Sequence, residues 1–73
     1  MRTFNLFRRK RQQDLYCAVP EDYAVPSFLN PREWEFGGKV EHPAASPGGF
    51  DPKAASTSVR FNGFYLFQAF DRR

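Results

Sequence analysis

The densest group of chemically active side chains in this 73-residue chain is a run of four basic residues: Arg8, Arg9, Lys10 and Arg11. Such a run can contact the phosphates of a nucleic acid or the carboxylates of an acidic protein. Residues 1–13 contain five basic residues and no acidic one, whereas residues 14–71 contain four basic and eight acidic residues. We therefore predict that a polyanion would bind through this basic run near the N-terminus.

Catalytic and metal-binding chemistry find little support in the sequence. Cys17 and His42 are the only cysteine and the only histidine, and one residue of each type is no sign of a nucleophile with its base. The same pair would need two carboxylates to complete a structural zinc site. We therefore predict no catalytic residue, no metal and no other cofactor, and a protein that is not an enzyme.

Aromatic residues dominate the apolar composition, with nine Phe, three Tyr and one Trp. A domain of this size obtains only a few kcal/mol of net stability from its core, and Cys17 cannot form a disulfide within the chain. Thirteen aromatic side chains, each of roughly 150–250 Å², are more than so short a chain is expected to enclose. We therefore expect association with a protein partner or with a second copy.

The sequence contains no stretch approaching the roughly 20 apolar residues of a membrane-spanning helix. The charged run that begins at Arg8 also leaves no room for the apolar part of a secretory signal. Together with the single free thiol, these features favour the cytoplasm or another reducing intracellular compartment.

The chain divides into two predicted parts. Residues 1–13 are expected to form a flexible basic arm, and residues 14–73 a single small domain with a proline-rich, loop-rich middle over 15–52. The predicted class is α+β and mainly β, with two β-hairpins or a short antiparallel sheet and one or two short helices. The alternative for the N-terminus is a lid, in which Phe4, Leu6 and Phe7 fold back over the aromatic C-terminal segment.

Residues 30–42 fit two local structures. The first is a short helix that begins at Asn30, with Pro31 in its first position. The second, which we favour, is a β-hairpin with a three-residue loop, Gly37-Gly38-Lys39. This hairpin would group four side chains: Trp34, Phe36, Val40 and His42. His42 would then be a packed residue at the edge of an aromatic cluster rather than a catalyst.

Residues 50–63 also fit two structures. Asp51 followed by Pro52 matches the start of a helix, which Ser56, Thr57 and Ser58 would end within about two turns. Asn62-Gly63 matches the preferred type I′ turn of a β-hairpin, which is the structure that we favour here. The alternative is a helix from Pro52 to Asn62, followed by one strand.

The segment from Phe64 to Phe70 is predicted to be a strand with apolar side chains on both faces. A segment without charge or proline would be prone to aggregation if it were uncovered. We therefore expect one face to pack on the body of the protein and the other to meet a partner. The predicted partner-binding residues are Phe64, Tyr65, Leu66, Phe67 and Phe70.

These features predict a small protein-interaction module or accessory subunit, which docks through its aromatic C-terminal strand and its basic N-terminal arm. The alternative is a nucleic-acid-binding protein whose basic run contacts phosphates while exposed aromatic side chains stack on bases. The dependence of binding on salt concentration distinguishes the two functions. Phosphate contacts weaken steeply as the salt concentration rises, whereas an aromatic interface is nearly indifferent to it.

Overall fold

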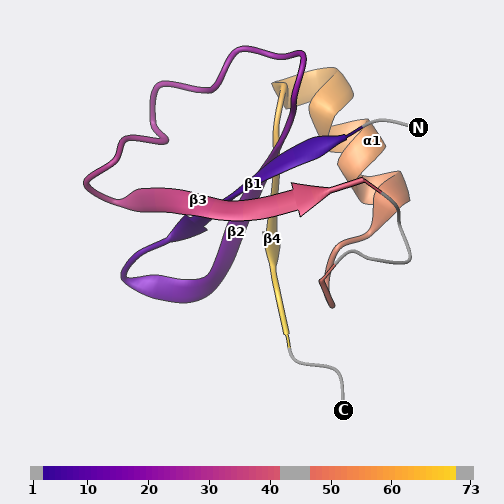
Figure 1. Cartoon of the computed structure of the whole chain (residues 1–73). Coiled ribbons are helices and arrows are strands. Elements are labelled where there is room, and N and C mark those ends of the chain that lie inside the picture. Colours follow the sequence, from indigo (N-terminus) through magenta and orange to yellow (C-terminus); the bar gives the residue numbers. More distant parts are fainter. Residues whose placement is uncertain (1–2, 42–46, 71–73) are drawn as a thin grey trace.

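The computed structural model describes residues 3–41 and 47–70 (Figure 1). They form four strands and one helix: β1 (Phe4–Arg9), β2 (Gln12–Pro20), β3 (Trp34–Val40), α1 (Pro52–Asn62) and β4 (Tyr65–Gln68). The strands make one antiparallel sheet in the order β3-β1-β2-β4. This architecture confirms the predicted class, α+β and mainly β with a short antiparallel sheet.

Strand β1 occupies the segment that was expected to be a flexible arm, so that expectation is wrong for Phe4–Arg9. β1 pairs with β2 on one side and with β3 on the other, which makes it an interior strand. Phe4 and Leu6 alternate into the core and are 8% and 4% exposed. The lid alternative is closer to the structure, but these residues lie within the sheet rather than over it.

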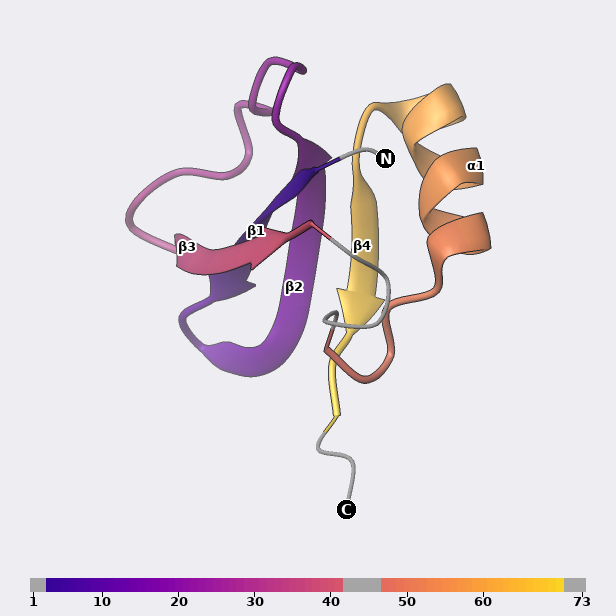
Figure 2. The same cartoon turned by 45° about the vertical axis from the view of Figure 1, so that its right-hand side comes forward.

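Both faces of the sheet are covered, each by a different part of the chain. On one face, Ala55 and Val59 of α1 pack into a core cluster that includes Leu6 of β1 and Phe67 of β4. The two views of the fold show α1 running alongside β4 (Figures 1 and 2). On the other face, a second cluster contains Cys17, Val19 and Trp34, with Leu29 from the β2–β3 connection packed against it. The covering helix therefore lies at the β4 end of the sheet.

Strand β3 runs without a break through Gly37-Gly38, so the hairpin predicted there is wrong. The β1–β3 register shifts between Leu6 and Phe7, which gives β3 one extra residue and absorbs the glycines in a bulge. Asn30 does act as a cap, because its Oδ1 accepts hydrogen bonds from two backbone N–H groups at 3.1 Å. The capped segment is only a turn that leads into β3, and His42 lies outside the described residues.

Helix α1 replaces the hairpin that was predicted at Asn62-Gly63. Asp51 caps its start, and Gly63 ends it in the left-handed conformation at φ 84°, with its N–H donating to the Val59 carbonyl at 2.9 Å. The helix also runs past Ser56, Thr57 and Ser58, so the two-turn limit is wrong as well. Burial of Ala55 and Val59 outweighs the low helix propensity of those three exposed or half-buried side chains.

Burial of Cys17 makes the stability of the fold depend on pH. The side chain is fully buried, and desolvation raises the pKa of its thiol from about 9 to about 12. Between these values the folded chain keeps a proton that the unfolded chain has lost, so the free energy of unfolding falls as the pH rises above about 9. We expect the free energy of unfolding of the unchanged chain to fall with pH by up to about 1.4 kcal/mol per pH unit more than that of the Cys17→Ala variant. Urea unfolding of the unchanged chain and of Cys17→Ala from pH 7 to pH 10.5 measures this difference. Parallel pH profiles of the two proteins would contradict the prediction.

Candidate functional site

Strand β4 lies at one end of the strand order and pairs with β2 along its other side. The Ala69 N–H donates to the Asp14 carbonyl at 2.7 Å, which continues the ladder beyond the strand. Hydrogen-bonded residues alternate along an antiparallel pair, so Tyr65 and Phe67 also direct their backbone groups to β2. The backbone N–H and C=O groups of Leu66 therefore point away from β2, toward the open edge of the sheet.

Two contacts bound this open edge. At one end, the Ser58 hydroxyl donates to the Phe64 carbonyl at 2.7 Å. At the other end, the Phe70 N–H donates to the Gly48 carbonyl at 3.0 Å, in an isolated antiparallel bridge. The backbone of Gly49 lies so close to the Gln68 carbonyl that no side chain fits between them. The stretch around Leu66 is thus the part of the β4 edge that the described chain leaves open.

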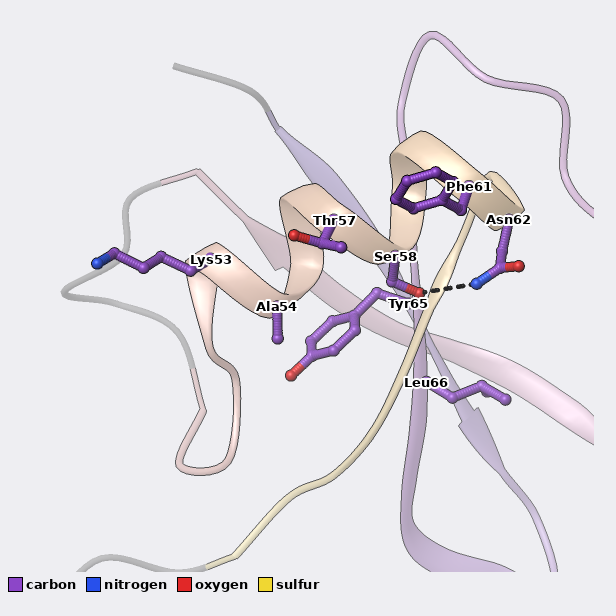
Figure 3. Close-up of a pocket in the computed structure, with 8 residues that line it drawn as sticks. All are labelled: Lys53, Ala54, Thr57, Ser58, Phe61, Asn62, Tyr65 and Leu66. Atoms are coloured by element: carbon purple, nitrogen blue, oxygen red, sulfur yellow. Dashed lines mark hydrogen bonds between the residues drawn. The ribbon is translucent and has the colours of Figure 1, made fainter.

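A groove of about 530 Å³ runs between α1 and this edge (Figure 3). Its walls include four helix residues, Lys53, Ala54, Thr57 and Phe61, and two strand residues, Tyr65 and Leu66. Phe61 and Leu66 are 77% and 46% exposed. Figure 3 shows Lys53 and Phe61 toward opposite ends of α1, with the Tyr65 ring beneath the helix between them. An apolar surface therefore borders backbone hydrogen-bonding groups that no described residue engages.

The other edge of the sheet, formed by β3, is built differently. It carries the bulge described above, and its charged side chains are engaged: Arg8 Nη2 lies 2.6 Å from Glu35 Oε2, and Lys39 Nζ lies 3.5 Å from Glu21 Oε2. Bulges and charges are the usual means by which an edge strand avoids pairing with another chain. Strand β4 has no charge or proline between Tyr65 and Gln68. Of the two edges, β4 is therefore the one suited to an additional strand.

The five residues predicted to bind a partner are divided between the core and the surface. Tyr65 and Phe67 are 9% and 6% exposed and face the helix, so they belong mainly to the core, although Tyr65 also lines the groove. Leu66 and Phe70 are exposed, and Phe64 is half-buried with its ring centroid 5.0 Å from that of Phe28. Sequence reasoning missed Phe61, which reaches the groove only if residues 52–62 form a helix.

The predicted basic run is not a common surface. Strand alternation sends neighbouring side chains to opposite faces, and the strand β3 beside it supplies acidic partners. Arg8 donates two hydrogen bonds to Glu35 at 2.6 and 2.9 Å, which raises the pKa of its guanidinium above the usual value. Arg9 lies over the Trp34 ring, 5.5 Å from its centroid, and 3.7 Å from Glu33.

The remaining two residues of the run lie in the turn between β1 and β2. Lys10 Nζ donates to the Pro31 carbonyl at 2.7 Å, and Arg11 has no ion pair within the described chain. Three of the four basic side chains thus bind groups of the protein itself. The nucleic-acid alternative therefore lacks a continuous basic surface at these four positions.

Comparisons of the chain with models of protein families, with curated proteins and with solved structures found no match. Within residues 3–41 and 47–70, no helix has the length and apolar character needed to cross a membrane. The candidate site therefore rests on the geometry of β4 and α1.

Proposed function

We propose that this protein is a small, non-enzymatic interaction module or accessory subunit that binds an extended segment of a partner protein as an additional strand beside β4. The observation that carries the proposal is the uncharged, regular edge at Leu66, open beside the α1 groove. A strand added to such an edge gains main-chain hydrogen bonds, and neighbouring pockets select its side chains. The exposed rings of Phe61 and Phe70 add apolar contacts next to the edge.

The position of α1 favours a segment of another protein over a second copy of this chain. A two-fold pairing of β4 with β4 would place both α1 helices on the same face of the joined sheet. Because α1 flanks the groove, the second helix would enter the space that the side chains of the added strand must occupy. An extended segment without a covering helix meets no such obstacle.

A proline at position 66 tests the proposal, because it removes the one N–H that strand addition needs at the centre of the edge. The ladder to β2 uses Tyr65 and Phe67 instead, so Leu66→Pro is expected to keep the fold, as edge prolines with an outward N–H do. Leu66→Ala is the matched control, since it shortens the side chain and keeps the N–H. Circular dichroism and urea unfolding check that both variants are folded.

Peptides of eight randomised residues, displayed on phage, are selected against the full chain, and the enriched peptides are synthesised for calorimetric titration. We expect Leu66→Pro to weaken their binding roughly tenfold or more, through lost main-chain hydrogen bonds, and Leu66→Ala to weaken it less. Amide chemical shifts should change in β4 and α1 rather than in β3. Equal affinity for Leu66→Pro and the unchanged chain, or no enriched peptide, would refute strand addition at β4.

A further inference from the structure

Lys53 is the one charged residue among those that line the groove. Its side chain is exposed in the first turn of α1, and no other described residue forms an ion pair with it. The basic residues Arg8, Arg9 and Lys39 are instead paired with glutamates of the chain. The carboxylate of nearby Asp51 is turned to the helix backbone, where it accepts from the N–H groups of Lys53 and Ala54. Among the residues that the structure describes, an ammonium group without an ion pair therefore lies at one end of a groove that has no other charged side chain.

The spacing along the groove matches the repeat of an extended strand. Lys53 and Phe61 are eight residues apart on α1, a rise of about 12 Å. Four residues of a strand span about 13 Å, and side chains four positions apart point to the same face. Helix α1 and β4 run side by side in opposite directions (Figure 2), so a strand added beside β4 would follow the helix from one of these residues to the other.

The middle of the groove leaves space for a side chain between these two ends. The helix residues there are Ala54, Thr57 and Ser58, and all three side chains are small. The side chain two positions from each end of the four-residue span would point to the same face and would meet these small groups. Three alternate positions of an added strand thus have defined surroundings: an apolar end, a small middle and a cationic end.

We infer that the groove selects an extended segment with an apolar side chain and an acidic side chain four positions apart. The apolar side chain packs on the Phe61 ring, and the carboxylate pairs with the Lys53 ammonium group. The inference rests on the strand addition proposed above and adds the chemistry of the partner. It follows from charge complementarity, because Lys53 is the only charged residue among the described residues that line the groove, and none of the described residues forms an ion pair with it.

Charge reversal at Lys53 tests this selectivity. The same phage library is selected against the full chain, Lys53→Glu and Arg11→Glu; the last is the matched control, since it makes the same change of charge in the distant β1–β2 turn. We expect the full chain and Arg11→Glu to enrich an acid four positions from an apolar residue, and Lys53→Glu to enrich a base in its place. Replacing the acid of an enriched peptide by its amide should weaken binding to the full chain roughly two- to fivefold at low salt, with no loss toward Lys53→Glu.

The possible results distinguish strand addition at β4 from the chemistry inferred for the partner. Peptides that depend on the Leu66 N–H but show no acid preference, or the same preference in Lys53→Glu, would overturn the partner chemistry and leave strand addition standing. Peptides indifferent to Leu66→Pro would overturn both. Light scattering over a range of protein concentrations tests whether a second copy of the chain binds the β4 edge instead. A dimer that Leu66→Pro abolishes would show that a second copy, not a partner segment, pairs with β4.

Discussion

Replacing Phe67 by Ala is expected to lower the free energy of unfolding by about 3–5 kcal/mol. The Phe67 side chain is 6% exposed, and three rings surround it. Its centroid lies 5.6 Å from that of Tyr16 and 5.4 Å from that of Tyr65, both stacked, and 5.3 Å from that of Phe50, edge to face. Truncation would leave a cavity between β4 and α1 that these rings cannot all move to fill. Urea unfolding followed by circular dichroism measures the loss.

Phe61→Ala is the matched control for this experiment. It removes the same ring from a side chain that is 77% exposed, so the free energy of unfolding should change by no more than about 0.5 kcal/mol. The two variants together separate the core of the aromatic segment from its surface. If Phe61→Ala cost as much stability as Phe67→Ala, the ring at position 61 would be packed in the protein rather than available at the groove.

Replacing Leu6 by Ala is expected to lower the free energy of unfolding by about 2–5 kcal/mol. Leu6 is 4% exposed and belongs to the strand that pairs on both sides. The cavity would open in the centre of the cluster that joins the sheet to α1. Chemical unfolding measures this loss as well.

The control for Leu6→Ala is Leu66→Ala, because Leu66 is 46% exposed and loses the same atoms. We expect its effect on stability to be several times smaller. The comparison also distinguishes the two accounts of the N-terminus. A flexible arm would leave the free energy of unfolding unchanged when Leu6 is truncated, whereas an interior strand cannot.

The aromatic C-terminal strand illustrates what a local sequence pattern can and cannot predict. The alternation of Tyr65 and Phe67 with Leu66 separates the two faces of β4 without any knowledge of the fold. The pattern does not say which face meets the helix, because both faces are apolar. Packing against Ala55 and Val59 makes Tyr65 and Phe67 core residues and leaves Leu66 exposed on the opposite face.

The segments that contain glycine each fit two local structures, for a physical reason. Gly63 can end a helix or form part of a type I′ turn, since both structures need a left-handed residue at that point. The helix forms here because Asp51 caps it and its inner face is buried. Likewise, a Gly-Gly pair suits a bulge as well as a hairpin loop, and only the pairing with β1 shows that the chain runs on.

The sequence pattern also predicted part of the candidate groove. Sequence pattern placed a docking surface on the aromatic C-terminal segment, and Leu66 and Phe70 do lie at the surface. It could not find Phe61 or Lys53 as groove residues, because their nearness to β4 depends on the helix and on its return along the strand.

Local sequence pattern was enough to predict the class of the fold, the start of α1 at Asp51-Pro52 and the alternation of the aromatic strand, because these depend on neighbours a few residues away. The order of the strands became known from the three-dimensional structure alone. That order makes β1 an interior strand, brings Glu33 and Glu35 to Arg9 and Arg8, and leaves β4 at an edge beside the helix. Strand order depends on contacts between distant segments, which no local pattern in a chain of 73 residues specifies.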